Sequence, residues 1–149
     1  MAKQVRYGIV GLGHIAQVAV LPAFKSVAKN SVITALVTDD PRKAIKISKQ
    51  YKVPGVYSYE QFDELLKSDV VDALYICLPN NMHVEYAVRA LNAGIHVLCE
   101  KPLALSTSDC SEMQQAAESS GVKLMTAYRL HFEEANLEAM EIGKSKKLG

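Results

Sequence analysis

Glu100-Lys101-Pro102 is the segment whose residue types are best suited to chemistry. It follows an apolar run at 95–99, and Pro102 restricts the backbone directly after the charged pair. A lysine held at such a position can donate a hydrogen bond to a substrate hydroxyl or carbonyl oxygen and can share in proton transfer. A solvated ion pair between Glu100 and Lys101 at a strand end is the competing interpretation.

Other polar and titratable residues also gather directly after apolar runs. The segments are Gly11-Leu12-Gly13-His14, Thr38-Asp39-Asp40, Leu78-Pro79-Asn80-Asn81-Met82-His83 and Tyr128-Arg129-Leu130-His131. His83 is interpreted either as a polar residue of a first helical turn or as a ligand contact. His14 is expected to point at bound phosphates or at solvent. His96 lies inside a predicted strand and is expected to be structural, whereas spacing assigns no role to His131.

Gly11-x-Gly13-x-x-Ala16 follows the apolar run 5–10 and matches the dinucleotide-binding fingerprint, with Ala at the third position. Gly11 permits the tight turn from strand to helix, and Gly13 lets the backbone approach a pyrophosphate. Ala16 lets the helix pack closely on the strand. Backbone N–H groups from Gly11 to Ile15 would then face the phosphates. The motif alone is weak, because some methyltransferases carry a similar glycine turn.

Apolar β-type runs alternate with helical patterns six times. Strands are predicted at 5–10, 32–37, 53–57, 72–78, 95–99 and 122–127. The first predicted helix follows the glycine turn, is interrupted at Pro22, and continues with Ala23, Phe24 and Val27 on its buried face. Two further helices are predicted to start at Asp40-Pro41 and at the capping box Ser58-x-x-Gln61. The last three are predicted over 84–91, from Ser106 to Gly121, and from about 132 to 142. Because such crossovers are right-handed, this alternation predicts an α/β Rossmann fold, a doubly wound parallel sheet of order 3-2-1-4-5-6.

The bulk properties fit one cytoplasmic domain. The 149 residues include 49% hydrophobic residues, and the formal net charge of +1 gives no electrostatic case for nucleic acid or an anionic membrane. No apolar run reaches the ~20 residues of a membrane helix, and the segment before the first strand is too short for a signal peptide. Cys77, Cys99 and Cys110 lack metal-ligand spacing and are predicted to be reduced thiols, so no metal site is expected.

Together these motifs resemble the N-terminal half of the glucose-fructose oxidoreductase / inositol dehydrogenase (Gfo/Idh/MocA) family. The resemblance extends over essentially the whole sequence, and its most specific parts are Cys77-Leu78-Pro79-Asn80-Asn81-Met82-His83 and the stretch from Ala93 through Glu100-Lys101-Pro102 to Leu103. The segment 128–132, with Asn136 beyond it, is most similar to the glucose-fructose oxidoreductase branch. The resemblance implies NAD(P)-dependent hydride transfer at a carbinol or carbonyl carbon of a sugar, inositol or related polyol.

The resemblance also implies roles for individual residues. Lys101 is the catalytic lysine by the family pattern, in contact with substrate and the nicotinamide ribose. Arg129 is implied to reach the nicotinamide end or the substrate. The residues implied to line the cofactor, with Glu100 beside it, are Leu78, Pro79, Asn80 and His83.

The residues after the second predicted strand favour NADP over NAD. NAD-binding sites normally carry Asp or Glu at the end of that strand, where it grips the ribose 2′-OH. Thr38 stands there in this sequence, and Arg42 and Lys43 follow it. Thr38 carries no charge that would repel a 2′-phosphate. If Asp39 or Asp40 turned toward the ribose instead, NAD would be favoured.

Family members continue into a second α/β domain that binds substrate and carries a catalytic histidine. The sequence stops at Gly149, about where that domain would begin, so the resemblance implies an isolated cofactor domain at 1–149. A non-catalytic nucleotide-binding or redox-sensing module is the main alternative. A methyltransferase is a third hypothesis, disfavoured by Thr38 and without an explanation for Glu-Lys-Pro. The sheet edge that a second domain would cover is a candidate surface for homo-oligomer formation.

Overall fold

Six parallel strands form one sheet in the order β3-β2-β1-β4-β5-β6, which confirms the predicted Rossmann topology. The computed structural model describes residues 4–26 and 29–146, so Val27 lies outside the described residues. The strands are β1 (Val5–Val10), β2 (Ser31–Val37), β3 (Gly55–Tyr57), β4 (Ala73–Ile76), β5 (His96–Glu100) and β6 (Leu124–Ala127). The helices are α1 (Leu21–Ser26), α2 (Pro41–Tyr51), α3 (Phe62–Lys67), α4 (His83–Asn92), α5 (Thr107–Ser120) and α6 (Glu134–Lys144).

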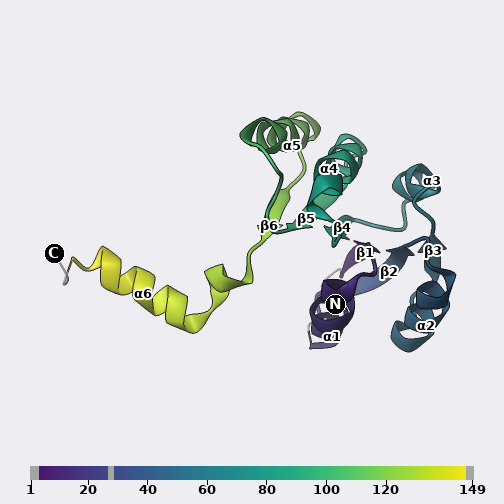
Figure 1. The fold of residues 1–149 in the computed structure, drawn as a ribbon, viewed down its shortest axis with the longest axis horizontal. Coiled ribbons are helices and arrows are strands. Elements are labelled where there is room, and N and C mark those ends of the chain that lie inside the picture. The colour runs from purple at the N-terminus through teal and green to yellow at the C-terminus, as the bar shows by residue number, and fades with distance from the viewer. Residues whose placement is uncertain (1–3, 27–28, 147–149) are drawn as a thin grey trace.

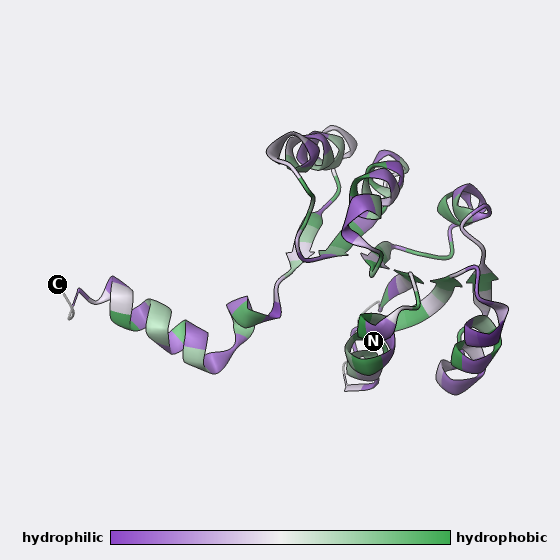
Figure 2. Cartoon of the chain, viewed as in Figure 1, coloured by the Kyte–Doolittle hydropathy of each residue, from purple (hydrophilic) through white to green (hydrophobic). Residues whose placement is uncertain are grey.

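Two layers of helices enclose the sheet. One apolar cluster joins the sheet to α3, α4 and α5, and a second cluster joins the opposite face to α1 and α2 (Figure 1). Figure 2 shows that the strands are largely hydrophobic whereas the helices mix both kinds of residue. Strands buried on both faces need such continuous apolar runs, which is why the strand positions are readable in the sequence.

Strand β1 lies between β2 and β4, and the order of the strands reverses there. Val10 at the end of β1 is in register with Val37 of β2 on one side and with Ile76 of β4 on the other. The segments that follow these three strands therefore leave the sheet at the same edge. In open α/β sheets this switch point is where ligands bind.

The predicted capping contacts form, although α3 begins only at Phe62, after the box that was predicted to start it. The Asp40 carboxylate accepts hydrogen bonds from the backbone N–H groups of Arg42 and Lys43 at the start of α2. Ser58 and Gln61 cap each other before α3, with each side chain accepting from the other's backbone N–H at 3.2 and 3.1 Å. These local contacts set where the helices begin, and hence where the preceding loops end.

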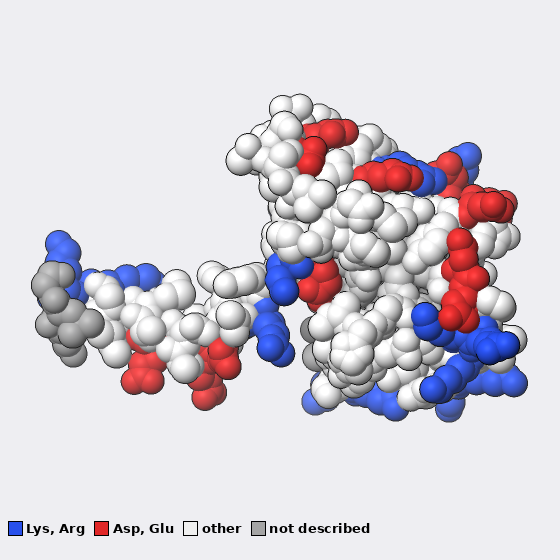
Figure 3. Space-filling model, in the orientation of Figure 1, with Lys and Arg blue, Asp and Glu red and all other residues white. Residues whose placement is uncertain are grey.

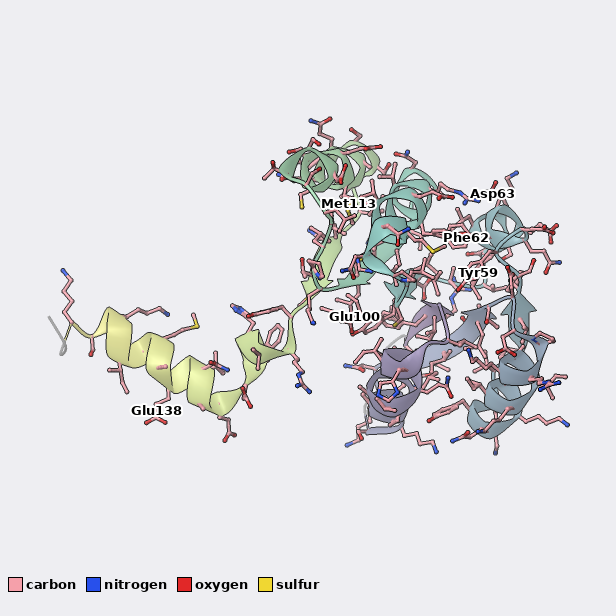
Figure 4. The ribbon with its side chains drawn as sticks, viewed as in Figure 1. Tyr59, Phe62, Asp63, Glu100, Met113 and Glu138 are labelled. Atoms are coloured by element: carbon pink, nitrogen blue, oxygen red, sulfur yellow. The ribbon has the colours of Figure 1, made fainter. Side chains whose placement is uncertain are left out.

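Packing between α3 and α4 fixes the upper layer in the view of Figure 4. Phe62 of α3 lies edge-on to the ring of Tyr86, with ring centroids 4.8 Å apart. Arg89 of α4 stacks over the Phe62 ring and pairs with Asp63 at 2.8 Å. Through these contacts α4, whose first residue is His83, is held in a fixed place beside the loop that follows β4.

The structure corrects several predicted boundaries. The interruption expected at Pro22 is a widened π-helical turn at Ala16–Val20, closed by the Leu21 N–H on the Ala16 carbonyl. The last helix begins later than predicted, because Phe132 ends a 3-10 turn (Arg129–Phe132) and extended Glu133 separates that turn from α6. Gly143 lies within α6 rather than after it. Strands β3 and β6 each begin two residues later than predicted, and β4 begins one residue later and ends two residues earlier.

Helix α6 extends away from the sheet (Figure 1). Its neighbour among the described residues is mainly the 3-10 turn before it. Glu138 points to solvent in Figure 4, while Leu137 and Met140 are each 43% exposed. None of the helices in the described part of the chain has the length and apolarity needed to cross a membrane.

Candidate functional site

The turn after β1 has the backbone that the glycine motif predicts. Gly11 has φ +89°, and an added Cβ there would lie 2.9 Å from the Cys77 carbonyl oxygen. Gly13 is exposed, and a Cβ added to it would have no protein atom within 4 Å. His14 and Ile15 are exposed beside it, whereas Ala16, the first residue of the π-helical turn, is fully buried. Gly11 is therefore required by the fold, and Gly13 leaves an open surface above the turn.

The loop after β2 contains the hydroxyl of Thr38 and two carboxylates that accept hydrogen bonds from backbone N–H groups. Thr38 is 9% exposed, and its Oγ1 accepts a hydrogen bond from the Asp40 N–H. Asp39 accepts the Tyr59 N–H at 2.9 Å. Asp40 caps α2 and also lies 3.3 Å from Nζ of Lys43. The backbone N–H of Lys43 is the main cause that lowers the pKa of Asp40, so this carboxylate stays charged at its cap.

Positive charge gathers over α2. Figure 3 shows Lys and Arg side chains clustered where Figure 1 places this helix. The side chain of Arg42 is exposed at the first turn, close in sequence to Thr38, and that of Lys43 is half-buried. The helix N-terminus adds to the positive potential on this side of the switch point.

The loops after β4 and β5 leave the sheet beside each other. Leu78 is buried, while Pro79 and Asn80 are exposed at the start of a 3-10 turn (Asn80–Met82) that leads into α4. Lys101 is exposed directly after β5, and the Lys101–Pro102 peptide bond is cis. Since β4 and β5 pair in parallel, these exposed residues lie at the same edge as the glycine turn.

The carboxylate of Glu100 is held by a phenol and a backbone N–H group, and not by the ammonium group of Lys101. Its Oε1 accepts the Tyr75 hydroxyl at 3.0 Å, and its Oε2 accepts the Lys101 backbone N–H at 3.3 Å. The ion pairs among the described residues do not include one between Glu100 and Lys101. Figure 4 shows Glu100 at the end of β5, at the carboxyl edge of the sheet.

Tyr75 is the site residue that sequence reasoning missed. It lies within the apolar β4 run, and only the pairing of β4 with β5 reveals that it shares a face with Glu100. Burial, and then the charge of Glu100, raises the pKa of the Tyr75 phenol well above its ordinary value. The phenol therefore stays a hydrogen-bond donor throughout the neutral range.

The histidines are placed differently from one another. The ring of His83 is fully buried, with Nδ1 2.9 Å from the Pro102 carbonyl oxygen and Nε2 2.9 Å from the Leu78 carbonyl oxygen. His96 is exposed at the start of β5, where its Nδ1 accepts the Lys123 N–H, in line with the structural role predicted. His131 lies edge-on to Phe132 in the turn after β6.

Arg129 and the cysteines complete the set of predicted residues. Arg129 is exposed in the turn after β6, two residues beyond Ala127, which pairs with Glu100. Cys77 and Cys99 are buried free thiols, as predicted. Burial raises the pKa of both, that of Cys99 to about 12, so they are protonated and inert at neutral pH.

Comparison with known proteins identifies the family of this chain. Residues 5–128 match the family described as "Oxidoreductase family, NAD-binding Rossmann fold", and the chain belongs to this Gfo/Idh/MocA family. It is 32% identical over 140 residues to D-xylose 1-dehydrogenase (NADP(+)) 2 of Haloferax volcanii, covering 94% of this chain and 42% of that protein.

Solved structures show the same relationship. The aldose-aldose oxidoreductase from Caulobacter crescentus superimposes with a TM-score of 0.90 at 37% identity, over 96% of this chain and 43% of that one. A 3-ketoreductase from Actinomadura kijaniata, in complex with NADP, superimposes with a TM-score of 0.87 at 28% identity, over 99% of this chain and 46% of that one. The chain thus spans less than half the length of these relatives.

Proposed function

We propose that this chain forms the cofactor-binding part of an NADP-preferring dehydrogenase that acts on a sugar, inositol or related polyol. One observation carries the proposal. The open turn at Gly13, the exposed residues Pro79 and Asn80, and exposed Lys101 follow β1, β4 and β5 at one edge of the sheet. Relatives that act on sugars share this part of the chain.

The residues present fit a dinucleotide. A Cβ on Gly13 would enter open space rather than protein, which is what a backbone that approaches a pyrophosphate requires. Exposed His14 and Ile15 lie beside it at the first turn of the helix, where N–H groups lack intrahelical partners. Exposed Pro79 and Asn80 follow β4 at the same edge of the sheet, where they would contact a bound dinucleotide.

The loop after β2 supports the preference for NADP. NAD-binding sites use a carboxylate to accept the ribose 2′-OH, but here Asp39 already accepts the Tyr59 N–H and Asp40 caps the start of α2. Thr38 Oγ1 accepts from Asp40, which leaves its hydrogen available to a phosphate oxygen. Arg42 follows at the first turn of α2 with an exposed side chain.

Lys101 is the residue proposed for catalysis. Nicotinamide supplies or accepts the hydride when bound. As an ammonium group, Lys101 would donate a hydrogen bond to a carbonyl oxygen and give it a proton as the carbon is reduced; as a neutral amine, it would accept the proton that a carbinol oxygen loses as the carbon is oxidised. Its exposed side chain starts next to Glu100, whose carboxylate is fixed by Tyr75 and the Lys101 N–H, so the backbone that presents the lysine is fixed as well. Arg129 is proposed to approach the substrate end from the turn after β6.

Calorimetric titration of NADP⁺ and NAD⁺ into the purified chain tests the cofactor assignment. We expect NADP⁺ to bind more tightly, and we expect Gly13→Val to lose binding while the fold persists. Gly143→Val is the matched control, because an added Cβ there also meets no protein atom within 4 Å but lies on α6. Normal cofactor binding by Gly13→Val would refute the site, and tighter binding of NAD⁺ would refute the preference.

A further inference from the structure

Among the described residues, His83 and Thr38 are the buried polar ones, and His83 is fully buried, with 0% of its surface exposed. It is the first residue of α4, but its ring does not face the open edge of the sheet. Instead its two nitrogens lie 2.9 Å from two backbone carbonyl oxygens, those of Leu78 and Pro102. Leu78 begins the loop after β4, and Pro102 follows Lys101 in the loop after β5.

The chemistry of these partners decides what the ring must do. A carbonyl oxygen only accepts, so each contact is a hydrogen bond only if the nitrogen concerned carries hydrogen. A bare ring nitrogen 2.9 Å from a carbonyl oxygen would place two lone pairs against each other. Both contacts are satisfied together when both Nδ1 and Nε2 donate, that is, when the ring is the imidazolium cation, whose charge the two carbonyl oxygens then stabilise. A buried partner left without its hydrogen bond would destabilise the site.

We infer that His83 is a positioning residue that joins the two loops by donating from both ring nitrogens. A ligand that restrains the loop at 78–82 then also restrains the backbone of Lys101. The inference rests on the proposed function, because it assigns the loop at 78–82 to the cofactor. The connection is short: one ring joins the carbonyl at the start of that loop to the carbonyl of the residue after Lys101.

Through this arrangement, cofactor binding at one loop can affect the backbone of Lys101 in the other. A ligand that orders Pro79 and Asn80 stabilises the Leu78 end of the loop, and His83 passes this restraint to Pro102. Among the hydrogen bonds of the described residues, those of the His83 ring are the ones that join the two loops directly. Coupling between sites needs such a physical connection with a measurable effect on both.

Amide hydrogen exchange on His83→Phe tests the connection. Phenylalanine keeps a planar ring of similar size but has no N–H. We expect NADP⁺ to slow exchange at residues 80–82 and at 101, 103 and 104 in the wild-type chain. In His83→Phe we expect slowing at 80–82 alone, with exchange at 101, 103 and 104 roughly tenfold faster than in the wild type, as for the loss of one buried hydrogen bond. Tyr86→Phe, one turn along α4, is the control and should behave as the wild type.

Two outcomes would overturn the inference. One is cofactor-induced protection at residues 101, 103 and 104 that is the same in His83→Phe as in the wild type. The other, measured on the wild-type chain and so independent of whether the variant folds, is a ¹⁵N spectrum in which one His83 ring nitrogen carries no hydrogen. Neither the spectrum nor the exchange rates without ligand require cofactor, so a chain that fails to bind NADP⁺ refutes the proposed function and leaves the connection through His83 to be judged separately.

Discussion

The hydroxyl of Tyr75 donates a hydrogen bond to Oε1 of Glu100 at 3.0 Å, and the two residues lie 25 positions apart on neighbouring parallel strands. This contact holds one oxygen of the carboxylate, while the Lys101 N–H holds the other. The end of β5, and with it the start of the Lys101 loop, is thereby fixed from a neighbouring strand that is itself largely buried.

Tyr75→Phe should weaken the fold measurably. It leaves Glu100 without its partner at Oε1, and a hydrogen bond to a charged group contributes about 1.5–3 kcal/mol. We expect the free energy of unfolding in urea at pH 7 to fall by about that amount. Tyr128→Phe, at a residue that is 52% exposed, should leave it unchanged. Equal stability of the two variants would contradict the structural importance of the contact.

The same residue predicts an alkaline limit to stability. The pKa of the Tyr75 phenol is raised in the folded chain, by burial first and then by the charge of Glu100. Because the folded chain favours the protonated phenol, this group stabilises the fold fully below the pKa that it has in the unfolded chain, about 10. The contribution is lost as the pH rises beyond that pKa. Unfolding measured at increasing pH should therefore become easier above about pH 10. The decline should be shallower in Tyr75→Phe, and identical slopes would count against this prediction.

Gly11 and Gly13 should respond to substitution in opposite ways. At Gly11 a side chain meets both a positive φ and the Cys77 carbonyl 2.9 Å away, so Gly11→Ala should lower stability by about 1–3 kcal/mol. At Gly13 the added Cβ meets open space, so Gly13→Val should unfold at the wild-type temperature yet bind no dinucleotide. Thermal unfolding and cofactor titration on both variants separate the two effects.

Thr38→Asp should reverse the cofactor preference. A carboxylate at this position would repel a 2′-phosphate and accept a hydrogen bond from a ribose hydroxyl. Because a charge-assisted hydrogen bond contributes about 1.5–3 kcal/mol, the ratio of the two affinities should change by roughly ten- to a hundredfold. Thr38→Ser keeps the hydroxyl and should keep the preference for NADP⁺. An unchanged ratio in Thr38→Asp would show that recognition lies elsewhere.

Lys101→Ala should separate catalysis from binding in a longer protein that contains this chain and the substrate-binding part. Turnover, followed by absorbance of reduced nicotinamide with a panel of sugars and polyols, should fall far more than cofactor affinity. Lys123→Ala, at an exposed lysine before β6, is the control. A Lys101→Ala protein with normal turnover would remove the lysine from the mechanism.

The 149-residue chain by itself should bind cofactor without turnover. Positioning of the reacting groups supplies about 7–11 kcal/mol of a typical barrier reduction. Exposed Lys101 offers one contact to a substrate at an open sheet edge, and alone it cannot align a polyol. The same absorbance assay on the purified chain checks this expectation, and saturable turnover would show that the catalytic site is already complete.

The sequence by itself determined the order of the elements and their approximate positions. Apolar strand runs, the Asp40 cap and the reciprocal Ser58–Gln61 cap are local features, whose physics involves residues a few positions apart. The glycine turn is local too, since Gly11 needs its positive φ whatever surrounds it. This is why the Rossmann order and the sheet edge that carries the candidate cofactor site could be predicted from the sequence.

Only the tertiary structure decided which partners the polar side chains take. His83 is bound to carbonyls five and nineteen residues away, Asp39 to an amide twenty residues away, and Glu100 to a phenol on the next strand. Spacing along the chain cannot express such contacts, because they depend on which strands are paired and in what register. The physical reason is that a buried polar group takes whichever partner the fold brings within hydrogen-bonding distance.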